Sequence, residues 1–230
     1  MKLSAAVMAH PARRESAEGV RAALQRDVPV IYDKNPRPSR DKMQRWRNGR
    51  RAWEAHDPGA DWHLVIQDDV LVADHILDAL ETALDGLGPD GLVSAYTGTG
   101  RPDQRNVKRA LTHADRHDLA WMSTRSLNWG PAIIAPVHTI PAMLDWCEDH
   151  IERNRPPKSN YDYAIGVYYR DVIGWRTWYT VPSLVEHRDD MPSLVGHDSG
   201  PKRVAHRFHA GDARRIDWSR VPHSGLIPEL

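Results

Sequence analysis

The sequence of 230 residues has very little cysteine and phenylalanine, with one residue of each. A single cysteine, Cys147, cannot form a disulfide within the chain, and no second thiolate is present to complete a zinc-thiolate site. Cys147 lies in a segment with a helical pattern, so we expect a buried and inert thiol. A disulfide-stabilised scaffold is therefore excluded.

Net charge and long apolar runs are also missing. Lys and Arg together number 31, as do Asp and Glu, so the formal net charge is zero and creates no overall field for nucleic acid or an anionic membrane. No segment approaches the roughly 20 apolar residues of a membrane-spanning helix. The first apolar stretch, residues 3–9, is short and is followed at once by His10, Pro11 and two arginines, unlike a secretory signal. We therefore expect no integral membrane segment and a cytoplasmic location.

The composition and the order of apolar segments predict an α/β fold. A hydrophobic fraction of 40% and a charged fraction of 27% are typical of a folded enzyme. Strand-like and helix-like segments alternate, which favours a mostly parallel sheet. Strands are predicted at residues 3–9, 28–32, 62–66, 91–96, 119–124, 132–136 and 175–181, and helices at 13–26, 41–55, 73–84, 140–153 and 161–170. Polar residues 97–118 are predicted to form a long loop, and the chain after Pro182 is predicted to be mostly loop.

Basic residues are unevenly spread despite the zero net charge. They gather at residues 37–51, 101–116 and 202–215. Such runs are usually solvated faces, and the alternative is contact with phosphates or a polyanionic acceptor. The nine tryptophans and seven tyrosines leave a similar choice between core packing and stacking on sugars or bases.

Two adjacent carboxylates form the strongest chemical feature. Gln67-Asp68-Asp69 follows the apolar strand 62–66, and ligands of open α/β sheets bind beyond the carboxyl ends of strands. Neighbouring carboxylates repel one another unless a cation or a hydrogen-bond donor lies between them. Mg²⁺ and Mn²⁺ prefer oxygen ligands and often bridge protein carboxylates to phosphates. The segment therefore indicates either a metal–diphosphate site or a helix N-terminal cap.

Two single residues are further candidates. His187 follows an apolar pair after Pro182, and an imidazole is a suitable additional metal ligand, although a lone histidine is more often structural. Asp162 lies near the start of a predicted short helix. There its carboxylate is either a general base or a helix cap.

Taken in order, these motifs resemble the GT-A-type glycosyltransferases, close to the bacterial and phage branches related to family 2 and to the lipooligosaccharide transferases. The resemblance covers most of residues 1–200. Its carriers are Met8-Ala9-His10-Pro11, Tyr32-Asp33, Gln67-Asp68-Asp69, Asn128-Trp129-Gly130-Pro131-Ala132, Tyr161-Asp162 and Pro182-Ser183-Leu184-Val185-Glu186-His187. It implies one Rossmann-like GT-A domain over residues 1–200 with helices on both faces of the sheet. The basic tail, residues 201–230, is then part of the same globule or an acceptor-side lid.

The resemblance also implies roles on the donor side. The nucleotide would lie against Ala9, His10 and Pro11, and Asp33 would contact the base or ribose. Gln67 stands where the family usually has an acid, which weakens the ribose or metal contact and leaves Asp68 as a substitute.

Other roles concern the diphosphate and the acceptor. Asp69 and His187 would bind the divalent metal, Mn²⁺ or Mg²⁺. Arg13 and Arg14 could reach the diphosphate, since guanidinium groups suit phosphate oxygens. Asp162 matches the acid that deprotonates the acceptor hydroxyl in inverting members.

The implied activity is metal-assisted transfer of a sugar from a nucleoside-diphosphate sugar to an acceptor hydroxyl. The acceptor would be a saccharide, a lipid-linked group, a protein or modified DNA. The basic segments 101–116 and 202–215 could close over the donor or hold the acceptor, and His206 and His209 could approach the phosphates. Alternatives are a phage-type enzyme that glycosylates hydroxylated DNA bases, a metal-dependent nucleotide-sugar phosphohydrolase and a non-catalytic sugar-binding module. The sequence leaves open the sugar, the nucleotide, the acceptor, the stereochemistry and the oligomeric state.

Overall fold

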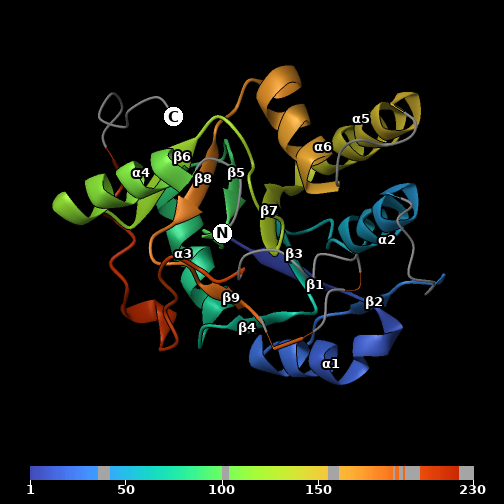
Figure 1. The fold of residues 1–230 in the computed structure, drawn as a ribbon, viewed down its shortest axis with the longest axis horizontal. Helices are drawn as coiled ribbons and strands as arrows, with labels where there is room; N and C mark the ends of the chain where they lie inside the picture. Colours follow the sequence, from blue (N-terminus) through green and yellow to red (C-terminus); the bar gives the residue numbers. More distant parts are fainter. Residues whose placement is uncertain are drawn as a thin grey trace.

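A seven-stranded sheet forms the centre of the protein in a computed structural model that describes residues 1–35, 42–99, 104–154, 161–188, 190–191, 194 and 203–222 (Figure 1). Its strands are β1 (Leu3–Ala9), β2 (Val30–Tyr32), β3 (Trp62–Gln67), β5 (Leu92–Ser94), β6 (Trp121–Thr124), β7 (Ala132–Pro136) and β8 (Thr177–Thr180). They lie in the order β2-β1-β3-β7-β5-β8-β6. Two further strands, β4 (Val70–Val72) and β9 (Val185–His187), form a small antiparallel sheet.

The central sheet is mixed but mostly runs one way. Strand β1 pairs in parallel with β2 and β3, and β5 pairs in parallel with β8. Strands β7 and β6 are antiparallel to their neighbours. Central strand β3 has no apolar–polar alternation because it is covered on both faces, as is typical of buried sheets.

Helices cover both faces of the sheet, which confirms the predicted α/β class. They are α1 (Arg14–Ala23), α2 (Lys42–Glu54), α3 (Ile76–Leu87), α4 (Gln104–Arg116), α5 (Ile140–Arg153) and α6 (Tyr161–Val167), and a π-helical segment, Tyr168–Ile173, continues α6. Helices α1, α3 and α4 share one hydrophobic core with the sheet, whereas α2, α5 and α6 share the other. The second group lies together on one side of the sheet (Figure 1).

Helix α4 corrects the prediction of a long loop over residues 97–118. Its buried side chains, Val107, Ala110 and Ala114, recur at helical spacing and pack on the core of α1 and α3. The narrow apolar stripe is hidden in the sequence by the arginines and polar residues on the exposed face. The described chain after Pro182 is mostly loop, as predicted, and includes the short strand β9; strand β4 was not predicted. Residues 155–159, between the two last predicted helices, are also predicted from the sequence to form a loop, and they lie outside the described residues.

The described part of the basic tail, residues 203–222, packs on the same core. Ala213 and Trp218 are buried, and the Trp218 and Trp121 ring centroids are 5.5 Å apart. Single β-bridges connect this segment to the rest of the chain at Gly98–Ala205 and Ser183–Phe208. The predicted division of the chain at residue 200 stays a prediction.

Within the described ranges, no helix is long and apolar enough to cross a membrane.

Candidate functional site

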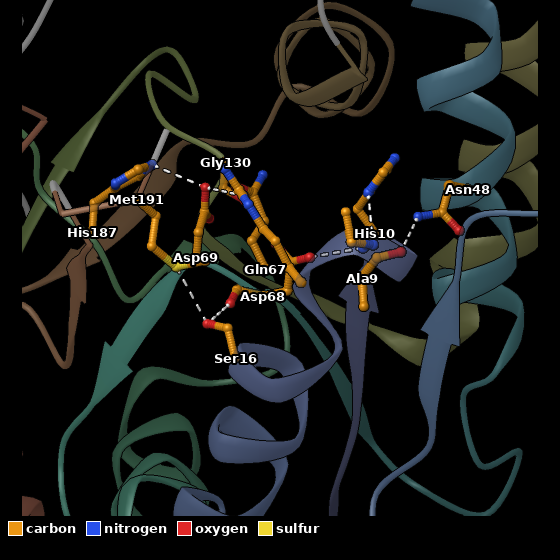
Figure 2. A network of polar contacts seen from close by, with 12 residues as sticks. Ala9, His10, Ser16, Asn48, Gln67, Asp68, Asp69, Gly130, His187 and Met191 are labelled. Atoms are coloured by element: carbon orange, nitrogen blue, oxygen red, sulfur yellow. Dashed lines mark hydrogen bonds and ion pairs between the residues drawn. The ribbon is translucent and has the colours of Figure 1, made fainter. Parts of the chain in front are cut away.

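The candidate site lies where three parallel strands end. Met8 of β1 is in register with Gln67 of β3, and Ala9 is in register with Tyr32 of β2. The residues that follow these strands therefore emerge at one edge of the sheet, where ligands of open α/β sheets bind. Figure 2 shows Gln67, Asp68 and Asp69 at the end of β3, with His187 on one side and His10 on the other.

Asp68 is held from two directions by the chain that follows β1. The backbone N–H of His10 donates to Asp68 Oδ2 (2.7 Å), and Ser16 Oγ of α1 donates to the Asp68 carbonyl (2.6 Å). Burial, together with the charge of Asp69, raises the pKa of Asp68 to about 6, while the His10 N–H and Arg13 oppose this shift. The carboxylate is therefore mostly ionised at neutral pH.

Arg13 bridges the two carboxylates. Its Nη1 lies 3.2 Å from Asp68 Oδ1 and 2.7 Å from Asp69 Oδ2, and its side chain is only 9% exposed. Arg13 is positioned by the short 3-10 helix Pro11–Arg13, which begins directly after β1. The guanidinium offsets the repulsion between the acids. The role expected for Arg13 was contact with a diphosphate, whereas here it contacts two carboxylates.

His187 reaches the site through the small sheet. Val70 of β4 is in register with His187 of β9, and the Arg188 N–H donates to the Asp69 carbonyl (2.8 Å). His187 Nε2 then lies 3.4 Å from Asp69 Oδ2. Burial lowers the pKa of His187, and the nearby Arg203 and Arg13 act in the same direction, while Asp69 opposes them. The imidazole is therefore neutral at neutral pH, so its contact with Asp69 is not an ion pair.

Asp69 and His187 are the residues that would hold a divalent cation. Asp69 Oδ1 is buried and has no hydrogen-bond partner among the described residues, which leaves one carboxylate oxygen available. The described part of the chain contains no group of three His, Cys, Asp or Glu side chains placed to bind a metal. Mg²⁺ and Mn²⁺ commonly take one or two protein ligands and complete their coordination with substrate phosphates and water. The Asp69 oxygen that faces His187, Oδ2, is already in contact with Arg13, so a cation bound by Asp69 and His187 stays a prediction.

Asp162 lies on the other side of Gln67, at the start of α6. Gln67 Nε2 donates to the Gly130 carbonyl (3.1 Å) and to Tyr161 Oη (3.0 Å), and Tyr161 Oη donates to the same carbonyl (2.8 Å). A Cβ added at Gly130 would lie 2.9 Å from Asp162 Cβ, so the aspartate side chain rests against this glycine. The loop before β7 therefore brings Asp162 to the same region as the Asp68–Asp69 pair.

The remaining predicted residues line the ends of β1 and β2. The Ala9 carbonyl accepts from the Asp33 N–H (2.8 Å) and from Asn48 Nδ2 (3.2 Å). The Asp33 carboxylate accepts from the Asn35 N–H (3.0 Å). Pro11 opens the short helix that carries Arg13. The roles of Ala9, His10, Pro11 and Asp33 toward a nucleotide stay predictions.

Several contributing residues had no signal of their own in the sequence. Ser16 and Asn48 are ordinary helix residues, and Tyr161 carried no predicted role. Arg203 was expected only as one member of a basic run, yet it lies close enough to His187 to lower its pKa. Of the tail histidines, His209 Nε2 lies 3.2 Å from the Asp212 carbonyl within the tail itself.

No protein-family model and no curated protein sequence matches the chain. Solved structures that are similar to it include the following two. One is a glycosyltransferase involved in the glycosylation of the major capsid of PBCV-1, with 12% identity, a TM-score of 0.37, and coverage of 74% of this chain and 76% of that chain. The other is mannose-1-phosphate geranyltransferase from Thermus thermophilus, with 14% identity, a TM-score of 0.35, and coverage of 78% of this chain and 74% of that chain. Similarity this low assigns no function.

Proposed function

We propose that the protein is a glycosyltransferase that moves a sugar from a nucleoside-diphosphate sugar to an acceptor hydroxyl. One observation carries the proposal. Two adjacent buried carboxylates, Asp68 and Asp69, meet a neutral histidine and an arginine at the carboxyl ends of parallel strands, and a third acid, Asp162, lies across Gln67 from them. This set combines cation-binding and proton-accepting groups at the edge where α/β sheets bind ligands.

On the donor side, the nucleotide would lie over the ends of β1 and β2, beside His10 and Asp33. Its diphosphate would then lie near Asp69 and His187, with Arg203 close by as an additional positive charge. A bound Mn²⁺ or Mg²⁺ would supply the charge that stabilises the departing nucleoside diphosphate.

On the acceptor side, Asp162 would accept the proton of the attacking hydroxyl. The acceptor oxygen forms a bond to the anomeric carbon while the bond from that carbon to the diphosphate oxygen breaks, which inverts the configuration. Because Gly130 has no side chain, the carboxylate of Asp162 can lie against the loop before β7. Tyr163, 51% exposed on the next position of α6, offers an aromatic surface for a sugar ring. The acceptor classes are a saccharide, a lipid-linked group, a protein and a modified DNA base.

The test is thermal unfolding with a panel of nucleoside diphosphates and nucleotide sugars, with and without Mn²⁺. A ligand that binds only the folded state stabilises it by about 2.7 kcal/mol at a hundredfold excess over its dissociation constant. We expect one nucleotide to raise the melting temperature in a Mn²⁺-dependent manner, and Asp69→Ala to abolish this shift. Asp149→Ala, an exposed change on α5, is the matched control and should retain it. A folded wild type that responds to none of these ligands would contradict the proposal.

Asp162→Asn separates the two halves of the proposed site. It should keep the nucleotide-dependent shift and lose transfer, by about 100-fold or more, because a general base is removed. Release of a sugar 1-phosphate and a nucleoside monophosphate, with no glycosylated product from any acceptor class, would instead favour a phosphohydrolase, because that reaction cleaves the diphosphate and leaves the bond at the anomeric carbon intact. Retardation of duplex DNA at low salt that weakens steeply with added salt would direct the search to a DNA acceptor.

A further inference from the structure

Gln67 is connected to three groups on the acceptor side of the site. Its backbone N–H donates to the Pro131 carbonyl (2.8 Å). Its side-chain Nε2 donates to the Gly130 carbonyl (3.1 Å) and to Tyr161 Oη (3.0 Å). Tyr161 Oη in turn donates to the Gly130 carbonyl (2.8 Å). Both hydrogens of the Gln67 side-chain amide are therefore used. The Gln67 amide, the Gly130 carbonyl and the Tyr161 hydroxyl form a closed hydrogen-bonded triangle.

The hydrogen-bonded triangle fixes Tyr161 and Gly130, the two residues that adjoin Asp162. Tyr161 precedes Asp162 at the start of α6, and a Cβ on Gly130 would lie 2.9 Å from Asp162 Cβ and 3.1 Å from Asp162 Oδ2. Burial raises the pKa of Tyr161 far above its usual range, and the charges of Asp162 and Asp69 add to this effect. The phenol therefore stays protonated and remains a donor to the Gly130 carbonyl.

An acid at position 67 would not support this arrangement. A carboxylate has no hydrogen to donate, so it would face the Gly130 carbonyl as a second acceptor. It would also add a negative charge beside Asp68 and Asp69, which are already close enough for Asp69 to raise the pKa of Asp68. The amide at this position is what the local hydrogen bonding requires.

We propose that Gln67 is a positioning residue that fixes the carboxylate of Asp162 relative to the Asp68–Asp69 pair, through Tyr161 and Gly130, and does not bind the donor. The inference rests on the proposed function, because it concerns the step in which Asp162 accepts a proton. It replaces the donor-side role that the sequence resemblance implies for Gln67.

Three variants test the inference. Gln67→Met keeps the length of the side chain and removes both hydrogen bonds, Gln67→Glu introduces the acid, and Tyr161→Phe removes the other partner. Tyr169→Phe is the matched control, because Tyr169 is also buried, in the core that contains α5, and its Oη lies 2.6 Å from Thr139 Oγ1. The measurements are the affinity for the nucleoside diphosphate that stabilises the wild type, by calorimetry, and the rate of its release from the matching nucleotide sugar in water.

We expect Gln67→Met and Tyr161→Phe to keep the nucleoside diphosphate affinity within about twofold while the release rate falls by at least about tenfold. Gln67→Glu should be no more active than Gln67→Met. The double variant Gln67→Met/Tyr161→Phe should be little worse than either single variant, since both changes open the same triangle. Tyr169→Phe should leave both affinity and rate unchanged. Crystals of Gln67→Met should show the Asp162 carboxylate displaced from Gly130, with Asp68 and Asp69 in place.

Three results would overturn the inference. The first is a loss of nucleoside diphosphate affinity of about tenfold or more in Gln67→Met, or tighter Mn²⁺-dependent binding in Gln67→Glu, either of which makes residue 67 a donor ligand. The second is a wild-type release rate in both Gln67→Met and Tyr161→Phe. The third is a wild-type protein that binds none of the nucleoside diphosphates. That result would contradict the proposed function itself, and it is told apart from the first two because it is seen in the wild type, without any variant.

Discussion

His63 and Asp69 are both buried, but they differ in whether all of their polar side-chain atoms have hydrogen-bond partners. His63 Nδ1 lies 2.9 Å from Ser4 Oγ, and its Nε2 lies 3.0 Å from the Ala52 carbonyl, so both ring nitrogens have partners. Asp69 Oδ1 has none among the residues that the structure describes. Buried polar atoms are normally hydrogen-bonded, and an exception in a cluster of charged groups points to a ligand. His63 is therefore structural, while Asp69 is the better candidate for binding.

The burial of His63 predicts a loss of stability in acid. Desolvation lowers the pKa of His63 from 6.5 to about 4, so the unfolded chain binds the proton more tightly than the folded protein. The stabilisation is complete above pH 6.5 and is lost as the pH falls toward 4, by about 3 kcal/mol in total. Urea unfolding across this range measures it.

A substitution isolates the contribution of His63. His63→Gln should flatten the pH dependence of the unfolding free energy between pH 6.5 and 4, although the variant is less stable than the wild type at neutral pH. His138→Gln, an exposed change, should retain the wild-type slope. An unchanged slope in His63→Gln would assign the acid sensitivity to other groups.

Helix α6 carries Asp162, and its position depends on a close approach to the loop before β7. A Cβ added at Gly166 would lie 2.8 Å from Leu127 Cβ and 3.2 Å from the Leu127 backbone nitrogen. Contacts this short with backbone and Cβ atoms cannot be relieved by rotating a side chain. Glycine at this position therefore allows α6 to pack against the segment that also contains Gly130.

Gly166→Ala should move α6 and weaken the fold. We expect a loss of about 1–3 kcal/mol in unfolding free energy, as for other overpacked positions, measured by urea unfolding. Gly19→Ala in the middle of α1 is the matched control, because no atom lies within 4 Å of the added Cβ. It should stabilise the protein by about 0.5–1 kcal/mol through helix propensity. Equal effects of the two changes would argue against the close packing of α6.

The protein as a whole has two hydrophobic cores, one on each face of the sheet, and the 203–222 segment belongs to one of them. Trp218 is 5% exposed, and its Nε1 donates to the Ala213 carbonyl (3.3 Å). A loosely attached lid would not bury a tryptophan in this way. The segment that brings Arg203 near His187 is thus anchored to the core at its other end.

Trp218→Ala should destabilise the entire protein. Truncating a large buried aromatic side chain costs about 3–5 kcal/mol, and the loss should appear in a single cooperative unfolding transition. Arg220 lies in the same segment as Trp218 and forms exposed ion pairs with Asp118 and Asp217. Arg220→Ala should therefore have little effect on the unfolding free energy. A Trp218→Ala variant as stable as the wild type would show that burial of this side chain does not stabilise the fold.

Local patterns in the sequence were sufficient for the α/β class and most of its elements. Strand β1 and helix α5 have the predicted bounds, because their apolar spacing is continuous and their ends are marked by turn residues. The position of Asp68 and Asp69 at a strand end follows from the same local pattern. Helix α4 was missed because only a narrow stripe of its residues is apolar, and the polar residues between them hide the helical pattern in the sequence.

The arrangement of the site depends on contacts between residues far apart in the chain. Arg13 and Asp68 are separated by 55 positions and Gln67 and Tyr161 by 94, and β4 pairs with β9, which follows all the strands of the central sheet in the chain. Hydrophobic periodicity reports the neighbours of a residue along one element, and carries no information on which elements pack together. The sequence alone therefore determined most of the elements and the edge of the sheet where the acids lie. Tertiary packing decided that an arginine bridges the acids, that His187 joins them, and that Gln67 bonds to Tyr161 and Gly130.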